Sequence, residues 1–236
     1  MLDYYSKRAH EYERIYLKPE RQADLVRLKE YLRGALRGQR ILELACGTGY
    51  WTAAIGDVAE SILATDASDA VLEIARSKGL DSAKVSFSRA DAFSPPRDHG
   101  DFTAGFAAFW WSHIPMAGLS SFLQNFHAAL RPGARIVFAD NRYVPGSSTP
   151  ISRTDEAGNT YQLRGLDDGS THEVLKNFPS PEQLTRTLEP FSKTVHVTEF
   201  DYFWCATCEL EAPSAAESGG ISAAHCPASA LPKPRT

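Results

Sequence analysis

The sequence of 236 residues contains no apolar run close to the roughly 20 residues that a membrane-spanning helix needs. Its first 20 residues are charged throughout and lack the apolar core of a signal peptide, so we expect a cytoplasmic protein. Neither sign of charge dominates, because 25 Lys and Arg stand against 29 Asp and Glu, a net charge of −4. This balance argues against a nucleic-acid binder held by phosphate contacts. With 43% hydrophobic residues, the composition fits a globular protein and excludes a collagen-like or wholly disordered chain.

Cysteine is also scarce, with only Cys46, Cys205, Cys208 and Cys226 in the chain. A disulfide scaffold or a zinc site would need further cysteines or other ligands at matched spacing. Cys205 and Cys208 form the one C-x-x-C pair, inside a segment that reads as a strand, where residues three apart face opposite sides of the sheet. We therefore predict buried structural thiols and no metal site.

Two helices are expected ahead of the main domain, within residues 1–38, and could form a lid. Residues 4–16 repeat large side chains at the spacing of one helix face, with Tyr5 and Tyr12 on that face. A second helix is predicted over residues 19–33, because it begins with a proline and a glycine follows it. This N-terminal stretch is mildly basic.

Residues 39–210 are predicted to form a single α/β domain, because strand and helix patterns alternate along them. Such alternation is typical of a parallel sheet with right-handed crossovers. Residues 141–180 break the pattern with Gly, Asp and Ser turn signals, and we expect a small antiparallel flap there. Residues 211–236, rich in Ala, Ser, Pro and Gly, are predicted to be a disordered tail. The predicted strands are 40–45, 61–66, 85–90, 102–109, 134–140, 194–200 and 202–209, and the predicted helices of the domain are 51–58, 69–77, 119–130 and 181–189. The last two strands follow one another so closely that they must pair antiparallel.

Residues 41–52, ILELACGTGYWT, join an apolar strand to a helix through a glycine-rich turn. Glycines at such a turn let the backbone approach a ligand closely, because no Cβ stands in the way. A dinucleotide-binding fold uses the same geometry, but its G-x-G-x-x-G pattern needs a third glycine where this chain has Thr52. Two acidic residues accompany the turn: Glu43 lies in the strand, and Asp66 ends the next one.

This segment resembles the first motif of the class I S-adenosylmethionine-dependent methyltransferases, an apolar strand with Asp or Glu followed by x-G-x-G. The resemblance continues in order over roughly residues 1–210, through ILATD, RADAF and FAAFWWSHIP at the ends of the next three strands. It implies a three-layer α/β sandwich with a seven-stranded, mostly parallel sheet whose last strand is reversed. It also implies S-adenosylmethionine as the cofactor. The residues that it assigns to cofactor binding are Glu43, Ala45, Gly47, Gly49, Asp66, Ala67, Asp91, Ala92 and Trp110.

Three carboxylates carry the chemistry of the implied site. Asp66 would accept both ribose hydroxyls in charge-assisted hydrogen bonds, the alternative being an N-cap for the helix that opens at Asp69. Glu43 would orient the backbone of Gly47 or the ammonium of the ligand, the alternative being a buried, hydrogen-bonded carboxylate. Asp91 would contact the adenine, the alternative being a cap on the turn before Pro95.

The acceptor side is marked by residues after the fourth strand and by the N-terminal helix. His113, with an ordinary pKa of about 6.5, is the candidate general base, the alternative being a surface histidine. Trp110 and Trp111 are adjacent, so we expect one to face the pocket and the other the core. Related small-molecule enzymes close a helix of pattern Y-x-x-R-A-x-x-Y over the cofactor, and residues 5–12 fit this pattern. The candidate acceptor-binding residues are Tyr5, Tyr12, Trp111 and Arg142, the last for an acceptor carboxylate.

Methyl transfer to an O, N or S atom of a small-molecule acceptor, by a monomer or homodimer, is the leading hypothesis. A tRNA base methyltransferase is an alternative that the basic N-terminal stretch supports. Enzymes acting on exocyclic amines usually carry Asn or Asp and then Pro-Pro after the fourth strand, where this chain has FWWS. The missing third glycine argues against a nucleotide-binding oxidoreductase. A protein that binds S-adenosylmethionine without turnover stays open, because a transfer site needs few chemically marked residues.

Overall fold

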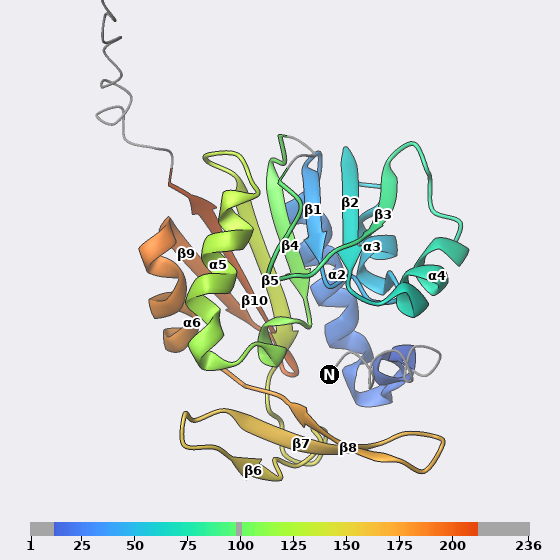
Figure 1. Cartoon of the computed structure of the whole chain (residues 1–236), viewed down its shortest axis with the longest axis vertical. Coiled ribbons are helices and arrows are strands. Elements are labelled where there is room, and N and C mark those ends of the chain that lie inside the picture. Colours follow the sequence, from blue (N-terminus) through green and yellow to red (C-terminus); the bar gives the residue numbers. More distant parts are fainter. Residues whose placement is uncertain (1–11, 98–100, 212–236) are drawn as a thin grey trace, which may run out of the picture.

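A seven-stranded sheet between two layers of helices forms the centre of the computed structural model, which describes residues 12–97 and 101–211 (Figure 1). The strand order is β3-β2-β1-β4-β5-β10-β9. Neighbouring strands from β3 to β5 are parallel, whereas β10 runs antiparallel to both β5 and β9. The expected mostly parallel sheet with a reversed last strand is therefore confirmed. The strands are β1 (Arg40–Leu44), β2 (Ser61–Asp66), β3 (Val85–Arg89), β4 (Ala104–Ala108), β5 (Arg135–Asn141), β9 (Ser192–Glu199) and β10 (Phe203–Leu210).

The central strand β1, of sequence RILEL, is buried on both of its faces, which explains why Ile41, Leu42 and Leu44 are apolar. Ile41 belongs to the core that α2, α3 and α4 cover, and Leu42 belongs to the core beneath α5 and α6. Because successive side chains of a strand point to opposite faces, one apolar run supplies both cores. The helices are α2 (Gln22–Leu36), α3 (Tyr50–Ile55), α4 (Asp69–Ser77), α5 (Leu119–Ala128) and α6 (Pro181–Leu188), and the 3₁₀ turns are η1 (Tyr12–Leu17), η2 (Pro19–Arg21), η3 (Trp111–His113), η4 (Met116–Gly118) and η5 (Glu189–Phe191).

The cysteines of the described residues are free and buried, as the sequence predicts. Cys205 and Cys208 lie in β10 and face the two opposite cores of the sheet. Burial raises the pKa of the Cys208 thiol to about 11, so the thiol stays protonated and unreactive at neutral pH. Cys226 lies outside the described residues.

The segment expected to form a flap contains a separate three-stranded antiparallel sheet, β6 (Arg153–Thr154), β7 (Thr160–Gly165) and β8 (Thr171–Leu175). Figure 1 shows this flap sheet beyond the edge at which the parallel strands of the main sheet end. The flap sheet therefore faces the edge of an α/β sheet where ligands usually bind.

The N-terminal segment differs in detail from the expected pair of helices. The predicted helix over residues 19–33 begins as the turn η2 and continues as α2 to Leu36, because Gly34 sits inside the helix without ending it. Residues 12–17 form the turn η1, and residues 1–11, with most of the first predicted helix, lie outside the described residues. The predicted tail at 212–236 lies outside them too. Within the described part of the chain, none of the helices is both long and apolar enough to span a bilayer.

Candidate functional site

The chain changes direction in the sheet between β1 and β4, because β2 and β3 follow β1 to one side and β5 follows β4 to the other. Open α/β sheets bind ligands at such a switch point, outside the carboxyl ends of the strands. The residues that directly follow these two strands, Ala45 and Phe109, have positive φ angles of 52° and 58°. Non-glycine residues in this conformation cost about 1–3 kcal/mol each and cluster at functional sites.

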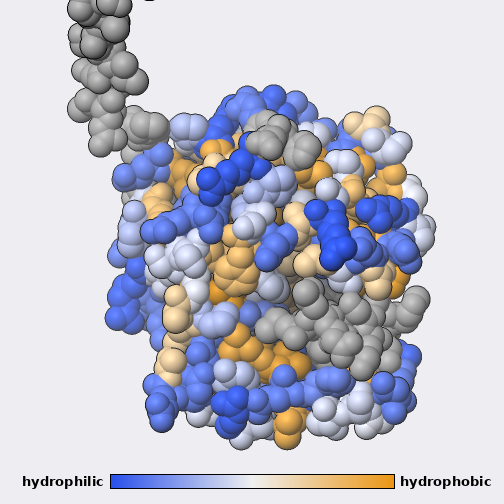
Figure 2. All heavy atoms as spheres, in the orientation of Figure 1, coloured by the Kyte–Doolittle hydropathy of each residue, from blue (hydrophilic) through white to orange (hydrophobic). Residues whose placement is uncertain are grey.

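A cavity of about 810 Å³ opens at this switch point. Most of its lining side chains are apolar, and Figure 2 shows apolar surface on this face between the main body and the flap sheet. The lining residues are Ala45, Gly47, Asp66, Ala67, Ser68, Val71, Arg89, Ala90, Asp91, Ala92, Phe93, Phe109, Trp110, His113 and Pro115. A cavity of this size with a few convergent polar groups is typical of a small-molecule or cofactor site.

The glycine-rich turn contributes its two glycines in different ways. Gly47 has a φ of +56° and lines the cavity, and a Cβ on it would meet nothing within 4 Å. Gly49 has a φ of +74°, and its Cβ would lie 3.0 Å from the Cβ of Ala75 in α4. Gly47 therefore keeps the cavity open for a ligand, whereas Gly49 allows the start of α3 to pack closely on α4.

Asp66 joins the glycine-rich turn to the start of α4. Its Oδ2 accepts a hydrogen bond from the Gly47 N–H at 2.9 Å, and its Oδ1 accepts one from the Ser68 N–H at 2.9 Å. Burial raises the pKa of this carboxyl, and the backbone donors of Ser68 and Gly47 act in the opposite direction. The arrangement fixes a carboxylate at the wall of the cavity.

Glu43 lies beneath the glycine-rich turn, 1% exposed, and is absent from the cavity lining. Its carboxyl accepts a hydrogen bond from Thr52 Oγ1 at 2.8 Å. Burial raises its pKa to about 8, which favours the protonated, neutral form at pH 7. Glu43 was expected to orient the backbone of Gly47, but the Gly47 N–H donates its hydrogen bond to Asp66 instead.

Another wall of the cavity is mainly apolar. Asp91 lines it and also caps a turn, because its Oδ1 accepts from the Phe93 N–H at 2.9 Å. Phe93 and Trp110 pack edge to face with ring centroids 6.1 Å apart. The indole Nε1 of Trp110 is buried and has no hydrogen-bond partner among the described residues. This wall suits a planar heteroaromatic ring.

His113 borders both the large cavity and a second cavity of about 210 Å³ that reaches toward the flap sheet. Its Nδ1 lies 2.7 Å from the carbonyl oxygen of Leu175. Because a carbonyl oxygen only accepts, Nδ1 carries the proton, and Nε2 is the basic nitrogen of the neutral ring. Burial, together with the cations of Lys176 and Arg164, holds the pKa of His113 well below its usual value, so the ring is neutral at pH 7.

A buried ion pair connects the flap sheet to this site. Lys176 Nζ lies 2.9 Å from Asp140 Oδ1, and the two side chains are 5% and 0% exposed. Asp140 Oδ2 also accepts from the backbone N–H and the hydroxyl of Ser112, at 3.0 and 2.7 Å. The sequence analysis did not predict this pair. Asp140 stands at the end of a predicted strand, but no pattern in the sequence relates it to Lys176.

Comparison with known proteins agrees with this geometry. A family model described as "Methyltransferase domain" matches residues 41–133. A solved structure titled "DhpI-SAH complex structure" is 32% identical with a TM-score of 0.72, covering 89% of this chain and 95% of that chain. The chain belongs to the class I S-adenosylmethionine-dependent methyltransferases. A second structure, titled "DhpI-SAM-HEP complex", is 30% identical with a TM-score of 0.71 over 88% of this chain and 94% of that one.

Curated relatives of this methyltransferase chain match over shorter stretches. A demethylmenaquinone methyltransferase of Clavibacter sepedonicus is 35% identical over 154 residues, 64% of this chain and 59% of the relative. An O-methyltransferase of Pyrenophora dematioidea is 33% identical over 130 residues, 53% of this chain and 46% of the relative. The chain thus spans about half of the length of these curated relatives.

The residues of the large cavity fit S-adenosylmethionine, the cofactor of this family. The fixed carboxylate of Asp66 can accept hydrogen bonds from a ribose diol. The apolar side chains of Ala92, Phe93 and Trp110, which line the cavity, suit contact with the faces of an adenine ring. Gly47 leaves free the space that a Cβ would fill.

The structure brings only part of the predicted acceptor side together in the methyltransferase. Trp110 and His113 line the large cavity, whereas Trp111 is 2% exposed and packs in the core against Phe138. Arg142 is held away from both cavities by ion pairing with Glu199 at 2.9 Å. Tyr5 lies outside the described residues. For Tyr12, which begins η1, only the backbone is described.

Another tyrosine of the N-terminal segment does anchor it to the site. The ring of Tyr16 stacks on Tyr50 with centroids 3.9 Å apart, and its hydroxyl accepts from Trp51 Nε1 at 3.0 Å. Tyr16 also packs edge to face on Phe109, with centroids 5.7 Å apart. The helical spacing over residues 4–16 already places Tyr16 on the same face as Tyr5 and Tyr12, although Tyr16 was not among the candidate site residues.

Proposed function

We propose that this methyltransferase transfers the methyl group of S-adenosylmethionine to an O, N or S atom of a small-molecule acceptor. The observation that carries the proposal is that Phe109 and His113 line both the large cavity and the smaller one beside it. A donor and an acceptor bound in the two cavities would meet at these residues. The names of the relatives support small acceptors, since one is an O-methyltransferase and another acts on demethylmenaquinone.

S-adenosylmethionine, when bound, supplies a methyl group on a sulfonium that is already a good leaving group. The protein therefore has mainly to align the reactants and exclude water. To align the cofactor, Asp66 and Gly47 hold it, and Trp110 forms part of the apolar wall against which it lies. His113 Nε2 accepts the acceptor's proton where the attacking atom carries one, which its neutral tautomer permits at pH 7.

The proposal is tested by calorimetric titration with S-adenosylhomocysteine and by release of S-adenosylhomocysteine during turnover. The parent should bind the product at micromolar concentration, and Asp66→Asn should weaken binding by roughly tenfold, about 1.4 kcal/mol. Asn keeps one acceptor oxygen, which serves the N–H of either Gly47 or Ser68, and loses both the second acceptor and the charge. Glu73→Gln on the exposed face of α4 is the matched control and should bind as the parent does.

Turnover decides the acceptor class. Pools of small hydroxylated, amino and thiol compounds are compared with bulk tRNA in the same assay. No binding of S-adenosylhomocysteine to the parent at millimolar ligand would overturn the cofactor assignment. Transfer to tRNA, with none to the small-molecule pools, would overturn the acceptor class.

A further inference from the structure

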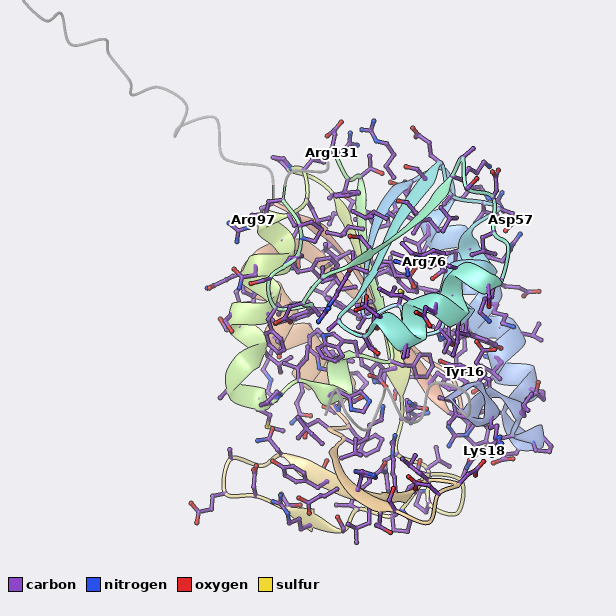
Figure 3. The ribbon with its side chains drawn as sticks, turned by 45° about the vertical axis from the view of Figure 1, so that its right-hand side comes forward. Tyr16, Lys18, Asp57, Arg76, Arg97 and Arg131 are labelled. Carbon is purple, nitrogen blue, oxygen red and sulfur yellow. The ribbon has the colours of Figure 1, made fainter. Side chains whose placement is uncertain are left out.

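The smaller cavity, of about 210 Å³, lies between the N-terminal segment, the chain after β5 and the flap sheet. Its volume corresponds to about seven water molecules, at about 30 Å³ each, so it suits a small functional group rather than a large ring system. Figure 3 shows Tyr16 and Lys18 on the N-terminal segment, with Lys18 nearer to the flap sheet. Lys18 lines the cavity from that side.

The charged side chains that line this cavity are all cationic. Its charged members are Lys18, Arg21, Arg164 and Lys176, and Asp and Glu are absent from the described lining. Lys176 is already compensated by the buried Asp140. The question is what balances the charge of the other three cations.

Within the described part of the chain, these three cations have only neutral hydrogen-bond partners. Arg21 donates from Nε to Ser147 Oγ at 2.9 Å and from Nη1 to Asn141 Oδ1 at 3.1 Å. Arg164 donates from Nη2 to Gln162 Oε1 at 2.7 Å. Lys18 donates to the carbonyl oxygen of Ser147. The hydrogen bonds hold the three groups in place but leave their charge unbalanced.

Glu20 is the carboxylate that comes close to this group, and it lies outside the cavity. It accepts from Ser147 Oγ at 2.8 Å and is exposed to solvent, where its charge is screened. It cannot offset three cations around a cavity that it does not line.

Arg21 makes the charge imbalance costly, because it is only 7% exposed. Its guanidinium lies over the rings of Tyr202 and Phe203, at 5.2 and 5.9 Å from their centroids. A buried cation without a carboxylate partner costs free energy, which a bound anion would return. The alternative, a purely structural tie between η2 and the chain after β5, explains the hydrogen bonds of Arg21 but not the convergence of Arg164 and Lys18 on the same cavity.

We propose that the acceptor of this methyltransferase carries an anionic oxyacid group, a carboxylate or a phosphoryl group, which Arg21, Arg164 and Lys18 bind in the smaller cavity. This inference rests on the proposed methyl transfer and adds the class of acceptor. Guanidinium groups suit such anions because their N–H groups match the geometry of two oxygens. An anion held there would place the rest of a small acceptor at His113, on the border with the donor cavity.

The experiment first saturates the protein with S-adenosylhomocysteine and confirms saturation by calorimetry. Inorganic phosphate, acetate and uncharged ethylene glycol are then titrated at constant ionic strength set with chloride. Saturable binding of phosphate or acetate at millimolar concentration is expected, with ethylene glycol inert. Stronger binding of phosphate identifies a phosphoryl group, and stronger binding of acetate identifies a carboxylate.

Three variants locate the site. Arg164→Gln and Arg21→Gln should each weaken anion binding by roughly tenfold, and Arg21→Lys should weaken it less because it keeps the charge. The affinity for S-adenosylhomocysteine should stay within twofold in all three, which shows that they are folded. Arg153→Gln, in the same flap sheet but paired with Glu173 away from the cavity, should leave anion binding unchanged.

A protein that binds S-adenosylhomocysteine but neither anion overturns the inference and leaves the proposed methyl transfer standing. Anion binding that survives in both Arg164→Gln and Arg21→Gln overturns it as well. Failure of the parent to bind S-adenosylhomocysteine instead counts against the proposed function itself.

Discussion

Replacing Lys176 by Met tests whether the buried ion pair holds the flap sheet on the main body. Met keeps most of the apolar stem of the side chain and removes the ammonium that lies 2.9 Å from Asp140 Oδ1 and 2.5 Å from Ser112 Oγ. The Asp140 carboxylate, 0% exposed, would then keep only neutral donors, those of Ser112 and Asn141. Breaking a buried pair from one side costs about 3–5 kcal/mol, because the remaining charge stays buried and uncompensated.

The structure places the expected loss at the lower end of that range, about 3 kcal/mol, because neutral donors still solvate Asp140. For a domain of this size the loss corresponds to a fall in Tm of roughly 6–12 °C. Urea unfolding followed by tryptophan fluorescence measures it at pH 7. The double variant Lys176→Met with Asp140→Asn removes both charges and should be more stable than Lys176→Met alone.

The pH dependence provides a second readout of the same variant. In the parent, burial raises the pKa of Asp140, but the Lys176 cation prevails and holds that pKa below its usual value. In Lys176→Met burial outweighs the hydrogen bonds that Ser112 and Asn141 still donate, so the pKa of Asp140 should rise above its usual value. The folded variant then binds a proton that the unfolded chain releases, and its stability should fall, relative to the parent, as the pH rises above about 4. A loss below about 1 kcal/mol at pH 7, or a double variant no more stable than Lys176→Met, would refute the reasoning.

Two further predictions concern the core beneath α5. Burial lowers the pKa of His127 to about 4, below its usual 6.5, so the unfolded chain takes up the proton first as the pH falls. Stability should therefore be complete above about pH 6.5 and decline by up to about 3 kcal/mol toward pH 4; His127→Phe should flatten this decline in urea titrations, and an unchanged slope would contradict the assignment. Gly105→Ala should lose about 1–3 kcal/mol, since a Cβ would stand 2.7 Å from Leu130 Cδ1 and Phe126 Cζ, whereas Gly34→Ala, with open space around its Cβ, should be neutral or gain up to about 1 kcal/mol. Thermal unfolding compares the two glycine variants, and equal stability would count against close packing of α5 on β4.

The order of strands and helices could be predicted because it follows from the spacing of apolar residues along the chain. The apolar run at Ile41 and the acidic stop at Asp66 identify β1 and β2 without any tertiary information. Element ends were less accurate, because they depend on packing. Gly34 was expected to end a helix that in fact continues to Leu36, since Leu28, Leu32 and Leu36 are all fully buried and hold the last turn in place.

The meeting of most donor-side candidates in one cavity was also predictable, because these residues follow directly on strands whose ends meet at one edge. The choice between Trp110 and Trp111 was not, since adjacent residues differ only in the direction that the turn η3 gives them. Arg142 was expected at the acceptor because of its chemistry, but Glu199 of β9 lies beside it once β9 and β10 join the sheet. A charged side chain does not reveal its partner until the topology is known.

The cations of the smaller cavity could not be predicted from the sequence. Arg21 comes from the N-terminal segment, Arg164 from β7 and Lys176 from the chain after β8, and no local pattern relates them. They meet because the flap sheet is tied to the main body, through Lys176 to Asp140 and through the Leu175 carbonyl to His113. One tie ends at Asp140 in β5, and the other ends at His113 in η3, the turn that follows β4 and borders the large cavity. On the proposed reaction the same edge of the sheet positions donor and acceptor, so a change in the flap sheet that loosens these ties should impair acceptor binding before it affects the cofactor.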